Sequence, residues 1–123
     1  TFYGMYDRYH SFRGNPAFEL PRRYLDGRNK IELSTPINFV STLDVVGGSS
    51  GSPVVNKEGE LVGLVFDGNI ESLVGSYVYD VGKNRTVAVD CRAMMEALVK
   101  LYDAQPLAGE LLGRGATGEI PGK

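Results

Sequence analysis

The sequence contains only one cysteine and one histidine among its 123 residues. Because Cys91 is alone, the chain can form neither an internal disulfide nor a metal site built from cysteines. Cys91 directly precedes a helical pattern, so we expect it to be a small, buried hydrophobic side chain. Three aspartates, Asp67, Asp80 and Asp90, have no histidine partners and no calcium-loop spacing. We therefore predict that the chain binds no metal and no cofactor.

Long apolar runs and dense basic clusters are also missing. No apolar run approaches the roughly 18 residues of a membrane-spanning helix, and no signal peptide is visible. The first residue is Thr1 rather than Met, and we expect a segment upstream of it. The net charge is −2, and neither the mildly basic residues 1–30 nor the acidic remainder has the basic stripe typical of nucleic-acid binding. We expect no membrane span and no nucleic-acid partner.

Breaks and periodicity divide the chain into three predicted segments. Residues 1–34 form a helical or irregular lead-in, interrupted by a Gly-Asn-Pro sequence at 14–16 and again at Pro21. Residues 35–103 combine short strands with a terminal helix. Residues 104–123 form a glycine-rich tail, in which we expect order to fade.

The second segment has the pattern of a mostly-β domain. The apolar run LVGLVF at 61–66 predicts a strand buried on both faces, and NKEGE at 56–60 predicts the hairpin turn before it. From Cys91 to Tyr102 the apolar residues recur at helical spacing, which predicts an amphipathic helix. The predicted strands cover residues 37–42, 54–55, 61–66, 77–79 and 86–89.

The loop at residues 47–53, with the sequence GGSSGSP, is the strongest candidate for a chemical site. A hydroxyl nucleophile has to sit on a tight turn, and flanking glycines allow that turn without Cβ clashes. The same turn can supply two backbone N–H donors to a developing oxyanion, here those of Gly48 and Ser50. A glycine-serine loop alone is a weak signal, and by itself it favours a flexible turn.

The order of the elements around this loop resembles the second barrel of chymotrypsin-like peptidases. There too a glycine-rich nucleophile loop precedes a strand, a hairpin, a strand that pairs with substrate backbone, and a C-terminal helix. Within that fold, the sequences TPINFVST at 35–42, GGSSGSP at 47–53 and FDGN at 66–69 resemble the bacterial dipeptidyl-peptidase 7 and 11 family. The resemblance covers roughly residues 35–103. It implies the C-terminal part of a double β-barrel serine peptidase that releases dipeptides from free peptide N-termini.

The resemblance also implies roles for single residues. Ser50 is then the catalytic nucleophile, and Gly48 and Ser50 donate to the oxyanion. Asp67 matches the carboxylate that holds the α-ammonium group of the substrate. Gly68 falls where the family sets the preference for the residue beside the cut, and glycine there implies a large apolar side chain.

Two residues depart from the patterns of these enzymes. The residue before the nucleophile is usually Asn in this family, whereas it is Ser49 here. Asp44 lies six residues before Ser50, where trypsin-like enzymes place the acid that binds Lys or Arg. If the specificity pocket is built as in trypsin, Asp44 predicts an endopeptidase with basic specificity instead.

The catalytic base is absent from the resembling segment. A serine nucleophile of this class needs a histidine base and an aspartate that orients it. The only histidine, His10, lies in the lead-in, where we expect a surface or packing role. We therefore expect the upstream part of the protein to supply both groups, and we expect the isolated chain to be inactive.

Two other classes of protein fit part of the pattern. Amidase-signature enzymes carry a similar glycine-serine loop, but they need several hundred α/β residues. A degenerate peptidase domain used for binding is the other alternative.

The resemblance to the dipeptidyl-peptidase family further implies peptide substrates, a homodimer and a periplasmic or extracellular location.

Overall fold

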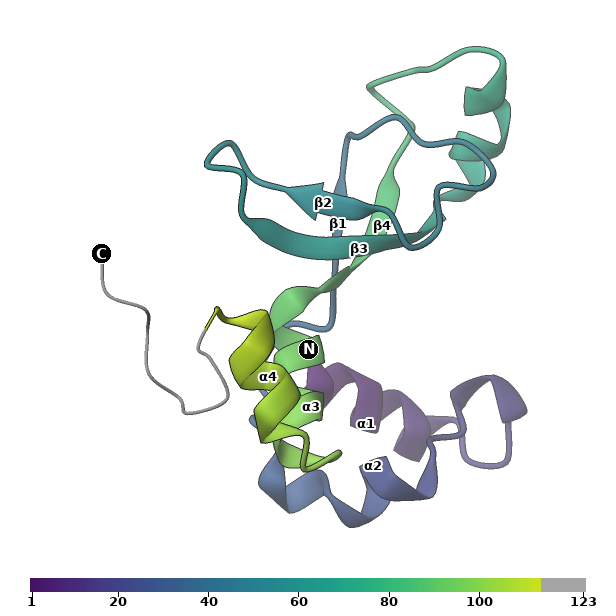
Figure 1. Ribbon diagram of the computed structural model, residues 1–123. Helices are drawn as coiled ribbons and strands as arrows, with labels where there is room; N and C mark the ends of the chain where they lie inside the picture. The colour runs from purple at the N-terminus through teal and green to yellow at the C-terminus, as the bar shows by residue number, and fades with distance from the viewer. Residues whose placement is uncertain (114–123) are drawn as a thin grey trace. The chain divides into compact units, whose positions relative to one another are not determined.

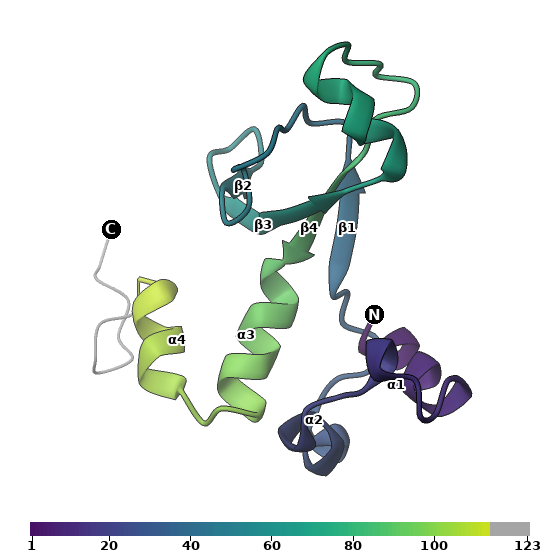
Figure 2. The ribbon, with the colours of Figure 1, turned by 90° about the vertical axis from the view of Figure 1, so that its right-hand side faces the viewer.

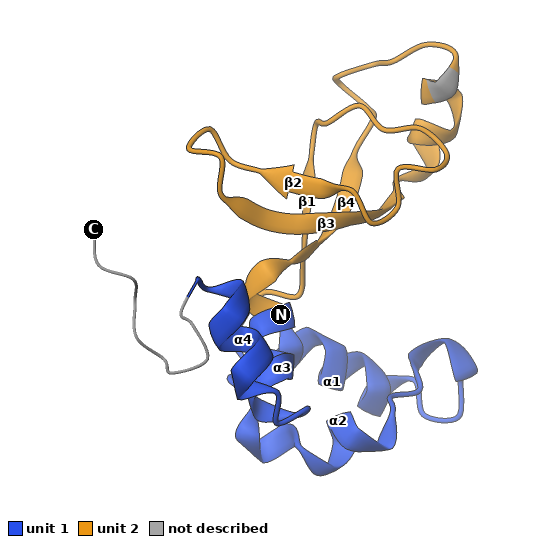
Figure 3. Ribbon diagram, viewed as in Figure 1, with its two compact units in different colours: residues 1–35, 94–123 blue, residues 36–93 orange. Residues whose placement is uncertain are grey.

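A computed structural model describes residues 1–113 of the chain, apart from the side chain of Ser76 (Figure 1). The chain divides into two compact units (Figure 3). Unit 1 contains Thr1–Thr35 together with the chain from Met94 onward, and unit 2 contains Pro36–Ala93.

Unit 2 is built on one antiparallel sheet of four strands in the order β1-β4-β3-β2 (Figure 1). The predictions of strands at 37–42, 54–55, 61–66 and 86–89 and of the turn at 56–60 are confirmed. The strands are β1 (Asn38–Ser41), β2 (Pro53–Val55), β3 (Leu61–Gly68) and β4 (Thr86–Asp90). The turn between β2 and β3 is closed by Asn56, whose side-chain oxygen accepts from the backbone N–H groups of Glu58 and Glu60.

A small apolar core lies on one face of this sheet. Val54, Val65 and Ala88 are its buried members, and Phe39, Val45 and Val62 pack against them. Gly63 allows the close packing of Phe39, because a Cβ at position 63 would lie 2.6 Å from the Phe39 ring and 2.6 Å from the Val89 carbonyl oxygen. The glycine within the LVGLVF run is therefore a packing requirement of the sheet.

Two sequence predictions in unit 2 were wrong. Strand β3 is not buried on both faces, since Leu61 is 51% and Phe66 43% exposed. Residues 77–79 do not form a strand, although their aromatic and β-branched side chains favour one. Instead, β3 leads into the 3-10 helix η3 (Ile70–Ser76), which follows β3 in Figure 2. Tyr77 comes directly after this helix with 90% of its surface exposed. Propensity failed here because the segment has no neighbouring strand among the described residues.

Unit 1 is helical, and its breaks fall where the sequence placed them. The Gly-Asn-Pro sequence and Pro21 separate its first short helices. The helices are α1 (Phe2–Ser11), η1 (Pro16–Phe18), α2 (Arg22–Asp26), η2 (Arg28–Lys30), α3 (Cys91–Lys100) and α4 (Gln105–Leu111). Helix α3 begins in unit 2 directly after β4 and continues in unit 1.

The architecture is mixed α/β with an antiparallel sheet. The prediction of a mostly-β fold with a helical lead-in and a C-terminal helix placed these parts correctly but underestimated the helical share, because helices contain more of the described residues than strands do. Part of the predicted glycine-rich tail, residues 104–123, forms helix α4, and its last ten residues lie outside the described part of the chain. Within the described residues, no helix combines the length and apolarity needed to cross a membrane.

Candidate functional site

The loop that carries Ser50 is a sequence of tight turns between β1 and β2. The backbone N–H of Ser49 donates to the carbonyl of Val46 at 3.1 Å, and the N–H of Ser52 donates to the carbonyl of Ser49 at 3.0 Å. The Ser49 hydroxyl closes the first turn from the other side, accepting from the Val46 N–H at 3.3 Å. Ser50 is therefore exposed within the second of two consecutive turns, directly after Ser49, which both turns share.

Two glycines give this loop its shape. Gly48 has φ +96° and Gly51 has φ +89°, a left-handed region that residues with a Cβ rarely adopt. They flank the Ser49-Ser50 pair, so the chain reverses on each side of it. This is the local reason why the GGSSGSP sequence folds as it does.

Strand β3 anchors the loop through the backbone of Val65. The carbonyl of Val65 accepts from the Gly51 N–H at 2.7 Å, and the N–H of Val65 donates to the Ser52 carbonyl at 2.9 Å. Val65 itself is buried in the core of unit 2. The position of Ser50 is therefore fixed to the sheet by a buried residue fifteen positions later.

A β-bulge changes the direction of the strand directly after this anchor. Val65 pairs with Ala88 of β4, but the next pair joins Asp67 to Val87, so Phe66 is an extra residue in β3. A bulge of this kind re-aims the side chains that follow it. As a result, Phe66 and Asp67 are both exposed, although they are neighbours in a strand.

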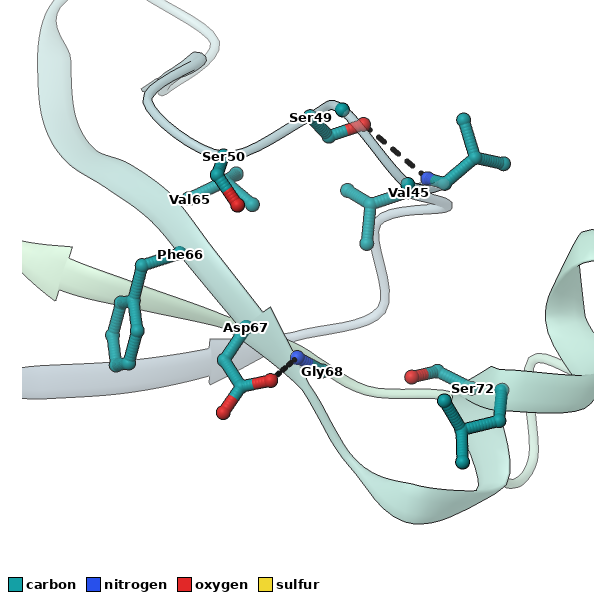
Figure 4. A pocket seen from close by; sticks show the side chains of 12 residues that line it. Val45, Ser49, Ser50, Val65, Phe66, Asp67, Gly68 and Ser72 are labelled. Carbon is teal, nitrogen blue, oxygen red and sulfur yellow. Dashed lines mark hydrogen bonds between the residues drawn. The ribbon is translucent and has the colours of Figure 1, made fainter.

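The loop, the bulged end of β3 and part of η3 line a cavity of about 340 Å³ in unit 2, which is open to solvent (Figure 4). Its lining is more apolar than polar, and its polar side chains are those of Ser49, Ser50, Asp67 and Ser72. The lining residues are Val45, Val46, Gly47, Gly48, Ser49, Ser50, Val65, Phe66, Asp67, Gly68, Ser72 and Leu73. An apolar cavity with a few convergent polar groups is typical of a small-ligand or substrate site.

The carboxylate of Asp67 is partly engaged in this arrangement. Its Oδ1 accepts from the backbone N–H of Gly68 at 2.8 Å, as the dashed line in Figure 4 shows. The side chain is exposed, so its negative charge stays accessible to a positively charged group.

Four of the five residues that the sequence singled out lie together at this cavity: Gly48, Ser50, Asp67 and Gly68. The fifth, Asp44, is exposed and is not among the residues that line it. His10 is exposed on α1 in unit 1, where its ring makes an edge contact with Tyr9.

Sequence reasoning missed the position of Ser72 in the lining and the bulge at Phe66. Ser72 lies in a stretch without a recognisable pattern, and only the structure brings η3 beside Gly68. The bulge left no sign in the sequence, because Phe66 reads as one more apolar residue of a strand. Among residues 1–113, no group of three or more His, Cys, Asp or Glu side chains is arranged to hold a metal ion.

Comparison with known proteins places this chain in a family of peptidases. The profile of the family "Peptidase S46" matches residues 1–113. The chain is 45% identical over 105 residues to the "Dipeptidyl-peptidase 7" of Phocaeicola vulgatus, a match covering 79% of this chain and 15% of that protein. It is 42% identical over 78 residues to the "Asp/Glu-specific dipeptidyl-peptidase" of Shewanella putrefaciens, covering 63% of this chain and 11% of that protein.

A solved structure agrees with these sequence matches. The crystal structure of Porphyromonas endodontalis DPP11 in complex with the dipeptide Arg-Asp superposes with a TM-score of 0.77 at 28% identity. That match covers 90% of this chain and 17% of the other. The chain thus spans about one sixth of the length of these relatives. The resemblance inferred from the loop and the FDGN sequence is confirmed: the chain belongs to the peptidase S46 family.

Proposed function

We propose that this chain forms the nucleophile-bearing part of a serine dipeptidyl peptidase, which releases dipeptides from peptides with a free N-terminus. In this proposal, unit 2 belongs to the second barrel of a chymotrypsin-like double β-barrel. The observation that carries the proposal is the cavity in which Gly48, Ser50, Asp67 and Gly68 meet. Family membership and the names of the relatives support the same reaction.

The proposed chemistry begins at the exposed hydroxyl of Ser50. Its oxygen attacks the carbonyl carbon of the second peptide bond, and its proton passes to a base. The oxyanion accepts hydrogen bonds from the backbone N–H groups of Gly48 and Ser50, and its collapse expels the amine of the remaining peptide, which takes the proton. Water then hydrolyses the acyl-enzyme ester and releases the dipeptide.

The base has to come from outside the residues described here. His10 is the only histidine of the sequence, and it lies on α1 rather than at the cavity. We therefore propose that an upstream part of the protein supplies the histidine and its orienting aspartate. On this basis the 123-residue chain alone is inactive.

Asp67 provides a physical reason for counting two residues from a free N-terminus. Its exposed carboxylate can pair with a substrate α-ammonium group while one oxygen keeps its bond to the Gly68 N–H. Such charge-assisted hydrogen bonds are about twice as strong as neutral ones. A blocked N-terminus removes the charge and so removes the interaction.

The lining of the cavity favours an apolar residue beside the cut. Val45, Val65 and Phe66 line it, and no lysine or arginine does so in the described chain. The named relatives include both dipeptidyl-peptidase 7 and Asp/Glu-specific enzymes, so the names alone leave the preference open. An acidic substrate side chain would need a cation that this cavity does not present. A trypsin-like preference set by Asp44 is not favoured, because that residue is absent from the lining.

An extended peptide can reach this cavity along the edge of β3. On its β2 side, strand pairing ends at Leu64 and the loop hydrogen bonds end at Val65. From Phe66 to Gly68 this edge has no partner strand in the described part of the molecule. Substrate backbone can add to such an edge as a further strand.

A homodimeric state and a periplasmic or extracellular location complete the proposal, on the basis of the family resemblance.

The test is hydrolysis of dipeptide reporters by the full-length protein, with Ser50→Ala as the control. The panel offers Leu, Arg and Glu beside the cut, each with a free and a blocked N-terminus. We expect turnover of the free Leu reporter and its loss on blocking and in Ser50→Ala. Equal turnover of blocked reporters would overturn the role of Asp67. No turnover by a folded protein would instead favour a binding module.

A further inference from the structure

Ser72 occupies the space into which a side chain at position 68 would project. Gly68 ends β3 beside the cavity, and Ser72 lies on η3 in the same lining (Figure 4). A Cβ built on Gly68 would overlap the hydroxyl oxygen of Ser72 and lie 3.3 Å from the Ser72 Cβ. Residues 68 and 72 therefore compete for one volume at the wall of the cavity.

The Ser72 side chain is held in this place by hydrogen bonds. Its hydroxyl donates to the carbonyl of Asn69 at 2.6 Å, and its backbone N–H donates to the same carbonyl at 3.0 Å. Rotating the hydroxyl away from position 68 would break the first of these bonds. The wall formed by Ser72 is consequently a preferred arrangement of the chain, not a loosely placed side chain.

Asn69 in turn is fixed to the segment that leads into β4. Its side-chain oxygen accepts from the Arg85 N–H at 2.8 Å, and its side-chain nitrogen donates to the Lys83 carbonyl at 2.7 Å. Its backbone N–H donates to the Arg85 carbonyl at 2.9 Å. The acceptor of the Ser72 hydroxyl is thus held on both sides, which fixes the wall relative to Gly68.

We propose that Ser72 is a second specificity-determining residue of this cavity, acting together with position 68. Gly68 leaves the space open and Ser72 fills the part nearest to it, so the size of residue 72 sets how large an apolar side chain the cavity accepts. The inference deepens the proposed peptidase function and depends on it. It also predicts that an arginine at position 68 cannot be accommodated while Ser72 keeps its place.

The first experiment compares substrates of increasing size in the full-length protein. Reporters with a free N-terminus and Ala, Leu or Phe beside the cut are assayed with Ser72→Ala and Ser72→Val. One methylene in an apolar pocket changes selectivity about tenfold or more. We expect Ser72→Ala to raise kcat/KM for Phe relative to Ala severalfold, and Ser72→Val to lower the same ratio about tenfold. Ser11→Ala, an exposed serine in unit 1, is the matched control and should change neither.

The outcomes separate the two proposals. An equal change for all three reporters would show that Ser72 only supports the fold, and the inference would fail while the peptidase function stands. No hydrolysis by the unmodified protein would overturn the function and the inference together.

A second pair of variants tests the competition without relying on turnover. Gly68→Ala should lower the thermal midpoint, because its Cβ meets the Ser72 hydroxyl. Adding Ser72→Ala should recover most of that loss, whereas Ser72→Ala alone should cost little. Additive losses in the double variant would contradict the shared volume.

Discussion

Units 1 and 2 differ in how they use their side chains. In unit 1, polar groups pair with one another: the Tyr6 hydroxyl donates to the Tyr24 carbonyl at 2.6 Å, and Glu96 accepts from the Glu32 N–H at 2.6 Å and from Lys100 at 2.7 Å. In unit 2, the side chains of Ser50 and Asp67 stay exposed at the cavity, whereas Ser49 and Ser72 are held by hydrogen bonds to the backbone of Val46 and Asn69. Unit 1 contributes no residue to this cavity, so its substitutions should change stability without changing reactivity, whereas substitutions around the cavity in unit 2 should change reactivity.

Unit 2 also leaves more large apolar side chains exposed. Its buried apolar side chains among the described residues are Val54, Val65, Ala88 and Ala93, all small or medium in size. The exposed members between residues 70 and 81 are Ile70, Leu73, Val74, Tyr77, Val78, Tyr79 and Val81. An exposed apolar surface of this kind is typical of a contact region, whereas unit 1 buries Phe2 and Tyr6 to 2% exposure.

The largest effect should come from a core aromatic residue of unit 1. Tyr6→Ala removes a buried ring, and such truncations cost about 3–5 kcal/mol. Tyr6→Phe keeps the ring and loses only the hydrogen bond to Tyr24, at about 1 kcal/mol. Both free energies of unfolding can be measured by urea denaturation. Below the melting range, kcat/KM of Tyr6→Phe should match that of the unmodified protein. A large fall in kcat/KM would contradict the expectation that unit 1 affects stability without affecting reactivity.

An intermediate effect is expected from Ser49, which braces the nucleophile loop. Its hydroxyl accepts from the Val46 N–H at 3.3 Å while its own N–H donates to the Val46 carbonyl. Ser49→Ala removes the first bond, and we expect kcat to fall about tenfold with KM little changed, since a misplaced nucleophile costs rate rather than binding. Ser49→Asn, the residue usual in the family, should restore most of the rate. An unchanged kcat in Ser49→Ala would show that the turns hold Ser50 without it.

The smallest effect should come from Asp90, whose carboxylate caps helix α3. Its oxygens accept from the backbone N–H of Arg92 at 2.9 Å and from the Arg92 guanidinium at 2.9 and 2.7 Å. These hydrogen bonds outweigh burial and lower the pKa of Asp90 below its ordinary 3.8. Because Arg92 is exposed and screened by solvent, we expect Asp90→Asn to cost only about 1 kcal/mol at pH 7.

The lowered pKa fixes the sign of the pH dependence. The stabilisation by Asp90 is complete above pH 3.8 and is lost as the pH falls through the lower folded-state value. The stability difference between the unmodified protein and Asp90→Asn should therefore shrink below pH 3.8. A difference that stays constant into strong acid would show that the charge of Asp90 plays no part.

The sequence predicted the sheet well where local pattern and packing agree. The alternation in residues 37–42 and the apolar run at 61–66 gave β1 and β3, and helical spacing gave α3. The strand predicted at 77–79 was wrong, because no partner strand lies beside this segment in the described part of the chain. The predicted burial of β3 on both faces was also wrong. Both features are determined by contacts between segments that are distant in the sequence, and hydrophobic periodicity carries no information about such contacts.

The candidate site could also be predicted from the sequence only in part. The glycine pattern of the loop was enough to predict Ser50 and Gly48 as site residues. Asp67 and Gly68 were predicted from the family resemblance. The hydrogen bonds of Val65 to the loop, the bulge at Phe66 and the approach of Ser72 could not be predicted. Each of them joins residues whose spacing in the sequence follows no motif.

The most direct test of the account is covalent labelling of the full-length protein with a fluorophosphonate, followed by mass spectrometry of the labelled peptide. We predict one phosphonylated residue, Ser50, and no label in Ser50→Ala. A label on Ser49 or Ser52, or retention of full labelling in Ser50→Ala, would contradict Ser50 as the nucleophile.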